Sequence, residues 1–174
     1  DISATLPDIA PDVVIARNDF ATTALSGNEP LTPLASFTPF TPMAEREPAL
    51  YLGFEPPPRR AALPTAPISF YADAPELLFG RPPDNAAAAT PAQLSWEYWN
   101  GAGWQRLAAR DDSAGMTRAG VVEFLPPIDM ALRADFDVAP RGWIRLRWTS
   151  GDFRHLPVVE QLRLNTTMAT QAAT

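Results

Sequence analysis

Ser95–Leu107 reads SWEYWNGAGWQRL, with three tryptophans and one tyrosine around an Asn-Gly pair. Aromatic residues on both sides of Asn-Gly are a strong signal for a β-hairpin, because both turn residues tolerate a positive φ. If the loop has four residues, Trp99 lies opposite Trp104 and Glu97 lies opposite Arg106. A two-residue turn changes these partners but leaves every side chain on the same face. The stretch therefore predicts an antiparallel hairpin with two distinct faces.

Alternation along the hairpin sorts its side chains onto these two faces. The face expected to enter the core carries Leu94, Trp96, Tyr98 and Leu107. The outer face carries Trp99 and Trp104 together with the cross-strand pair of Glu97 and Arg106. Two outward tryptophans can stack on a sugar or contact another protein, and exposed aromatic patches usually mark protein contacts. The sequence leaves both interpretations open.

Composition predicts one globular domain rich in β-structure. The chain has 174 residues, of which 46% are hydrophobic and 20% are charged, so it can form a hydrophobic core. Its 20 prolines interrupt long helices and favour short strands. The absence of cysteine excludes disulfides and thiolate metal sites. All 14 basic residues are arginine, and the net charge of −6 argues against a nucleic-acid-binding surface.

The sequence shows no membrane or secretion signal. No apolar run approaches the roughly 20 residues needed to cross a bilayer. The N-terminal residues lack the basic and apolar regions of a signal peptide. Because the chain begins at Asp1, we expect it to be a piece of a longer protein, with the polar residues 166–174 as a linker.

Prolines break the N-terminal part of the chain into short pieces, and we expect residues 1–48 to form a Pro-rich extended arm. Val13–Ala16 is a candidate short strand within it, and Phe37 and Phe40 are expected to dock the arm. Residues 49–165 are expected to form one β-sandwich domain.

Short alternating segments follow one another along that domain. The expected strands are Ala49–Phe54, Ile68–Ala72, the two arms of the hairpin, Gly120–Leu125, Trp143–Thr149 and Val158–Leu164. Pro82–Pro91 and Arg110–Arg118 are expected to be connections, and Ile128–Arg133 is a candidate single helical turn. About seven short strands without a long helix predict an all-β fold, an antiparallel β-sandwich.

The segment Trp143–Thr149, WIRLRWT, alternates most clearly. Ile144, Leu146 and Trp148 are expected to point inward, and Trp143, Arg145 and Arg147 outward. Outward arginines pair with acids across a sheet or at an interface, so Arg145 and Arg147 join the candidate contact residues.

Catalytic and metal-binding chemistry has little support in the sequence. The only histidine, His155, follows a turn, and one histidine without cysteine builds neither a metal site nor a nucleophile pair. Asp111 and Asp112 lack the alternating oxygen ligands of a calcium loop and are expected to form a solvated turn. A glycosidase pair of Glu97 with Asp111 or Glu123 is conceivable, but a cross-strand ion pair explains Glu97 better. We therefore expect no catalytic, cofactor or metal site.

Six segments, in this order, carry a family resemblance. They are Phe37–Thr41 (FTPFT), Glu47–Phe54 (EPALYLGF), Trp96–Gly101 (WEYWNG), Thr117–Phe124 (TRAGVVEF), Trp143–Arg145 (WIR) and Leu164–Thr166 (LNT). Together they resemble an internal segment of the large baseplate assembly proteins of phage-tail-like contractile injection systems, which are related to the J-type wedge proteins of phage tails. The resemblance covers nearly the whole chain.

The resemblance implies a structural role without enzymatic activity. Such wedge subunits surround the tail axis with six-fold symmetry and join the sheath, the central hub and the tail fibres. They are made in the bacterial cytoplasm and released with the particle. A β-sandwich within one would contact other baseplate subunits, with Trp99, Trp104, Arg106, Arg145 and Arg147 as the candidate surface. No nucleic acid or inserted membrane is implied as a partner. The alternative is a carbohydrate-binding module for surface attachment.

Overall fold

The computed structural model describes residues 11–18, 21–24, 36–40, 48–57, 62–75 and 90–164. In chain order its strands are β1 (Pro11–Asn18), β2 (Ala21–Ala24), β3 (Ala49–Phe54), β4 (Ile68–Asp73), β5 (Gln93–Trp99), β6 (Trp104–Arg106), β7 (Ala109–Asp111), β8 (Gly120–Phe124), β9 (Leu132–Arg133), β10 (Arg141–Ser150) and β11 (Gln161–Leu164). The described residues contain no helix, and hence none that could span a membrane. The predicted all-β fold is confirmed.

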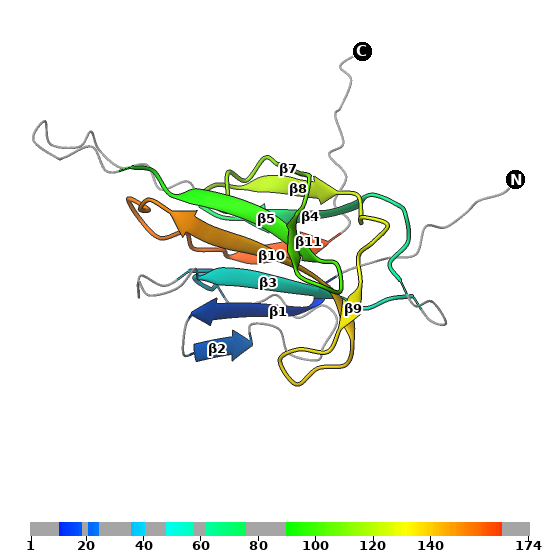
Figure 1. The fold of residues 1–174 in the computed structure, drawn as a ribbon. Coiled ribbons are helices and arrows are strands. Elements are labelled where there is room, and N and C mark those ends of the chain that lie inside the picture. Colours follow the sequence, from blue (N-terminus) through cyan, green and yellow to red (C-terminus); the bar gives the residue numbers. More distant parts are fainter. Residues whose placement is uncertain are drawn as a thin grey trace, which may run out of the picture.

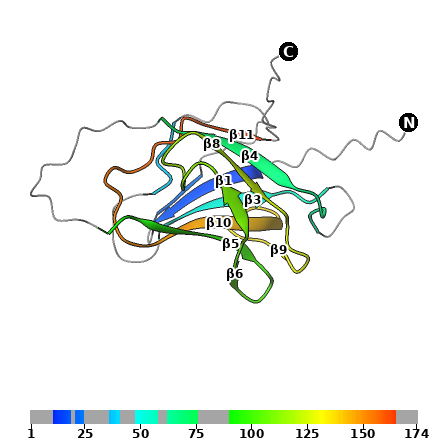
Figure 2. The same ribbon diagram turned by 90° about the horizontal axis from the view of Figure 1, so that it is seen from above.

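The strands form two antiparallel sheets that lie in two layers (Figures 1 and 2). The large sheet has the order β2-β1-β3-β10-β5-β6, and β9 also pairs with β10. The small sheet has the order β11-β4-β8-β7. In Figure 1 the large sheet lies in front, so its surface away from the small sheet faces the viewer. We call this surface the outer face.

The core lies between the two sheets. Leu50, Leu52, Ile144 and Leu146 of the large sheet have no exposed surface, nor does Phe70 of the small sheet. These positions alternate along their strands, as expected for one inward side of each sheet.

The hairpin faces are confirmed. Trp96, Tyr98 and Leu107 are 8%, 8% and 4% exposed and belong to this core, while Leu94 packs against it partly buried. The hairpin loop has four residues, because Trp99 pairs with Trp104 and Glu97 with Arg106 in the ladder. The Trp96 ring meets the Phe70 ring edge-on at 6.0 Å.

Parts of the expected arm, 1–48, belong to the sandwich. β1 and β2 lie within residues 1–48, and β1 pairs with β3 over most of the length of β1. Phe37 exchanges two 2.8 Å backbone hydrogen bonds with Val159. Phe40 is fully buried, with its ring stacked on Phe153 at 5.4 Å. Both phenylalanines therefore dock on the domain, as expected.

The helical turn expected at Ile128–Arg133 is wrong. The backbone instead makes a tight turn, in which the Met130 amide donates to the Pro127 carbonyl at 3.0 Å. The Ala131 amide then donates to the Trp99 carbonyl at 3.0 Å. Because the Ala131 amide is bound by the carbonyl of Trp99 in the hairpin, it cannot extend the turn as a helix, and the chain continues into β9.

Smaller differences concern segment ends. β2, β7 and β9 were not expected, and β7 begins one residue before the expected connection at Arg110–Arg118. β10 is longer than expected and β11 shorter. The expected loop at Pro82–Pro91 lies outside the described residues except for its last two positions, and the expected linker at 166–174 lies wholly outside them.

Candidate functional site

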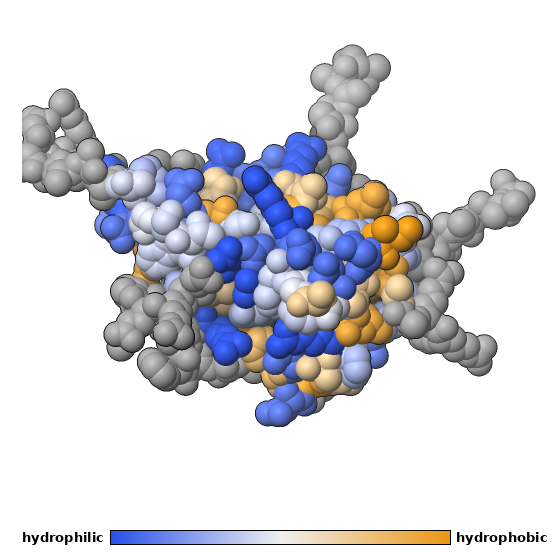
Figure 3. All heavy atoms as spheres, viewed as in Figure 1, coloured by the Kyte–Doolittle hydropathy of each residue, from blue (hydrophilic) through white to orange (hydrophobic). Residues whose placement is uncertain are grey.

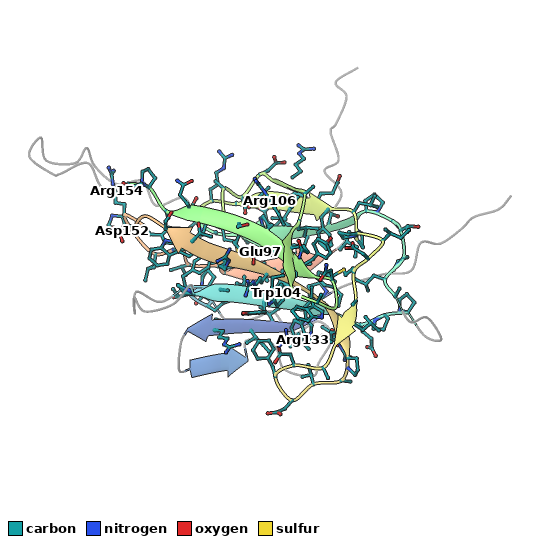
Figure 4. All side chains as sticks on the ribbon, in the orientation of Figure 1. Glu97, Trp104, Arg106, Arg133, Asp152 and Arg154 are labelled. Atoms are coloured by element: carbon teal, nitrogen blue, oxygen red, sulfur yellow. The ribbon has the colours of Figure 1, made fainter. Side chains whose placement is uncertain are left out.

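The five candidate contact residues lie together on the outer face. Trp99 comes from β5, Trp104 and Arg106 from β6, and Arg145 and Arg147 from β10. These three strands are neighbours, because β5 pairs with β10 on one side and with β6 on the other. Figure 4 shows Trp104 and Arg106 beside Glu97 in front of these strands. The alternation of side chains along Ser95–Leu107 and Trp143–Thr149 therefore correctly predicted that these five residues lie on one face.

Glu97 stands at the centre of this cluster and is held by two arginines of β10. Arg145 Nε donates to Glu97 Oε2 at 2.7 Å, and Arg145 Nη2 lies 2.6 Å from the same oxygen. Arg147 Nε and Nη2 donate to Glu97 Oε1 at 2.9 and 2.6 Å. The three side chains are only 8%, 15% and 21% exposed. Because little water reaches these charges, they depend on one another for stabilisation.

The expected ion pair between Glu97 and Arg106 is wrong. The two residues face each other in the ladder, but the Glu97 carboxylate is bound by β10 instead. Arg145 is the ladder partner of Glu97 on that side, and Arg147 reaches the same carboxylate from two residues further along. The side chain of Arg106 stays exposed on the edge strand and makes no hydrogen bond or ion pair with another described residue.

The two tryptophan rings are held in place by other rings and by guanidinium groups. Trp99 and Trp104 meet edge to face, with centroids 5.7 Å apart and planes at 67°. The guanidinium carbon of Arg133 lies 4.4 Å from the Trp99 centroid, and that of Arg145 lies 4.3 Å from the Trp104 centroid. Such cation–π contacts contribute roughly 0.5–1 kcal/mol each at exposed sites. The rings are tilted, and each has one face under a cation.

Trp143 was expected to point outward, together with Arg145 and Arg147. It does lie on the outer face but is only 1% exposed. Phe136 covers it edge-on at 5.3 Å, and the Trp143 indole N–H donates to the Arg133 carbonyl at 2.8 Å. On its other side the ring lies over Gly53, where a Cβ would come within 2.9 Å of it. The loop between β9 and β10 therefore closes a second small core on the outer face.

This second core explains why β3 is buried on both sides. Ile15, Ala49, Tyr51 and Trp143 form its buried part, with Val13, Trp99, Trp104, Phe136 and Val138 packed around them. Tyr51 joins it to the contact residues, because its ring meets Trp104 edge-on at 5.5 Å. Its hydroxyl accepts a hydrogen bond from Arg145 Nη1 at 3.3 Å.

The carboxylates considered for catalysis do not meet. Asp111 accepts four hydrogen bonds. One comes from the Trp96 indole at 2.8 Å, and the others come from the following turn, including one from the Ser113 hydroxyl at 2.6 Å. Asp111 therefore binds an inward-facing side chain of β5, whereas Glu97 lies on the outer face of the same strand. Glu123 lies exposed on the small sheet. Neither residue shares a surface with Glu97.

The described residues contain no cluster of three or more His, Cys, Asp or Glu suited to a metal ion. Asp112 forms a salt bridge with Arg110 at 2.9 Å, in the turn that the sequence predicts. His155 lies exposed in the loop before β11.

Among the residues that the structure describes, Tyr98 is the titratable group whose pKa is clearly shifted. Burial raises the pKa of its hydroxyl, and a 2.9 Å hydrogen bond to Asp129 Oδ1 raises the pKa further, because that contact needs the proton. The hydroxyl thus remains a donor that ties the loop after β8 to the hairpin.

Three residues of the surface were not singled out from the sequence: Tyr51, Arg133 and Phe136. Tyr51 had a signal, since the continuous apolar run ALYLGF is typical of a strand covered on both faces. Arg133 lies at the end of β9 and Phe136 in the loop that follows, where the sequence has no periodicity and therefore gives no signal for either residue. The arrangement offers flat rings, guanidinium edges and a free arginine at a sheet edge, which suit contact with another macromolecule.

No protein-family model and no curated protein matches the chain.

Proposed function

We propose that this chain is a structural module of a baseplate wedge subunit in a contractile phage-tail-like particle. The outer face of its large sheet mediates protein–protein contacts in baseplate assembly. The observation that carries the proposal is a partly exposed surface of tryptophan and arginine, built from β5, β6 and β10. Aromatic residues and arginine are enriched at protein interfaces. The identity of the assembly rests on the resemblance of six sequence segments.

The geometry of this surface suits docking. Glu97 holds Arg145 in place, and Arg145 in turn covers one face of Trp104. Side chains that are fixed before binding lose little conformational freedom on binding, so more of the contact energy appears as affinity. Arg106 projects from the short edge strand β6 and is available to a carboxylate of a partner subunit.

The ring geometry favours a protein partner over a sugar. A sugar stacks flat on an open ring face, and adjacent rings serve as one platform only when they are nearly coplanar. The planes of Trp99 and Trp104 differ by 67°, and each ring has a guanidinium over one face. A tilted, partly covered pair fits an irregular protein surface better.

The test uses the full-length subunit with Arg106→Glu. Arg106 is exposed and has no partner among the described residues, so the variant is expected to fold normally and to weaken docking by charge reversal. Electron microscopy is expected to show fewer intact baseplates. Arg154→Glu makes the same charge change on an exposed loop distant from Arg106 (Figure 4) and is expected to assemble normally.

A second variant separates protein contact from sugar binding. Trp99→Ala with Trp104→Ala removes both rings, and circular dichroism checks that the domain still folds. We expect this variant to reduce baseplate assembly as well. Normal baseplates, together with a specific hit of the wild-type domain on a glycan array that the variant loses, would contradict the proposal and favour surface attachment.

A further inference from the structure

Three large hydrophobic side chains are exposed among the described residues: Leu125 (56%), Ile128 (96%) and Val158 (37%). Two of them stand three residues apart in the loop after β8, and we call this pair the apolar knob. Figure 3 shows apolar surface at the end of the molecule where this loop lies in Figure 1. Exposed apolar side chains that gather in one place mark interaction sites more often than single ones do.

The apolar knob is displayed by a well-fixed loop. Pro126 and Pro127 restrict their φ angles, and the turn after them is closed by the bond from the Met130 amide to the Pro127 carbonyl. Met130 is 9% exposed and belongs to the core. Asp129 accepts the Tyr98 hydroxyl at 2.9 Å. Ile128 therefore stays exposed although both of its flanks are anchored.

A hollow lies at the other end of β8. It has a volume of about 730 Å³ and begins where β8 begins, with Tyr71, Ala74 and Val121 as its apolar lining. Arg110, Arg118 and Asp112 supply its charges. β8 has five residues, so the hollow and the apolar knob are separated by about 16 Å along the strand.

We propose that the apolar knob of one copy docks in the hollow of a second copy, so that copies of this chain associate head to tail. The charges are complementary, because Arg110 on the rim is paired with Asp112 and leaves the positive charge of Arg118 to face the negative charge of Asp129 beside Ile128. The two surfaces lie at opposite ends of β8 and differ from each other, so the contact is heterologous and each copy keeps one free surface. This self-association goes beyond the proposed function and does not use the outer face.

A membrane fits the apolar knob less well than a second copy. Insertion of an apolar loop into an anionic membrane is usually supported by neighbouring basic residues. Here the adjacent charge is Asp129, and the chain has a net charge of −6. The contact between copies is small, so we expect it to be weak and dependent on concentration.

The test is analytical ultracentrifugation of the chain at concentrations up to about 1 mM, where even a millimolar Kd is populated. The average mass of the wild type is expected to rise above the monomer mass of 18.9 kDa. Ile128→Asp removes the apolar knob, and Ala119→Glu fills the hollow with a longer acidic side chain; both positions are exposed. Each variant alone is expected to remain monomeric.

Mixing the two variants gives the sharpest result. Ile128→Asp retains an intact hollow and Ala119→Glu retains an intact apolar knob, so the mixture is expected to form dimers and nothing larger. Val158→Asp and Ala139→Glu make the same chemical changes elsewhere on the surface and are expected to associate like the wild type.

The proposal is overturned if the wild type stays monomeric throughout, if Ile128→Asp still associates, or if the mixture stays monomeric. Binding to phosphatidylserine vesicles that is lost in Ile128→Asp would also overturn it, in favour of a membrane. None of these outcomes bears on the proposed baseplate contact, which is tested separately through Arg106.

Discussion

Glu97→Gln removes one negative charge from between two guanidinium groups and preserves the size of the side chain. Both oxygens of the native carboxylate accept hydrogen bonds from Arg145 and Arg147. With glutamine, a neutral amide faces two cations, and its NH2 group can donate to neither. Removing one partner of a buried ion pair costs about 3–5 kcal/mol. One amide oxygen still accepts, so we expect about 3 kcal/mol, the lower end of this range.

Urea unfolding followed by tryptophan fluorescence measures this loss. With an m value of about 2 kcal/mol/M, the expected midpoint shift is about 1.5 M. Arg106→Gln is the matched control, because Arg106 faces Glu97 from the other neighbouring strand but is exposed. Its unfolding free energy is expected to stay within about 0.5 kcal/mol of the wild type.

A double-mutant cycle decides whether the charges act together. Arg147→Gln is expected to cost much less in the Glu97→Gln background than in the wild type, because it then relieves repulsion between two cations. Equal midpoints for Glu97→Gln and Arg106→Gln, or additive losses in the cycle, would refute the reasoning that the buried cluster stabilises the outer face.

Four further substitutions test the rest of the fold. Trp96→Ala is expected to cost about 3–5 kcal/mol in urea unfolding, because the buried ring and its indole hydrogen bond are both lost. Trp99→Ala is expected to cost clearly less, and equal losses would mean that the hairpin faces are misassigned. Gly120→Ala is expected to lower the Tm, since its Cβ would lie 2.4 Å from the backbone of the preceding turn; an unchanged Tm contradicts this contact. Above pH 10.0 the unfolded tyrosine loses its proton before folded Tyr98 does, so stability is expected to fall with pH more steeply in the wild type than in Tyr98→Phe. Parallel pH profiles of the two proteins would contradict the perturbation.

Local sequence was sufficient for the hairpin. The Asn-Gly pair and the aromatic alternation around it predicted the faces of Trp96 and Tyr98, and a four-residue loop gave the register of Trp99 with Trp104. All of this depends on residues within a few positions of one another. The same holds for the inward positions of β10, where Ile144 and Leu146 alternate with arginines.

The features that the sequence did not predict have a common physical cause, which is contact with segments that strand alternation does not describe. Alternation assigned Trp143 to the outer face but could not show that the loop carrying Phe136 folds back over it. In the same way, the hairpin presented Arg106 as the neighbour of Glu97. The arginines that bind its carboxylate lie 48 and 50 positions further along the chain. Which of two adjacent strands supplies the counter-charge depends on strand order, which the local pattern does not contain.

The central position of β10 also has a consequence for synthesis of the chain on the ribosome. β3 and β5 both pair with β10, which begins about 90 residues after β3 ends. At 5–20 residues per second, β3 therefore waits about 4–18 s for this neighbour to be translated. During that time its apolar edge is open to pairing with another chain. A nascent chain stopped before Arg141 would hold β1 with β3 and β5 with β6 as two separate half-sheets, each with an unprotected edge.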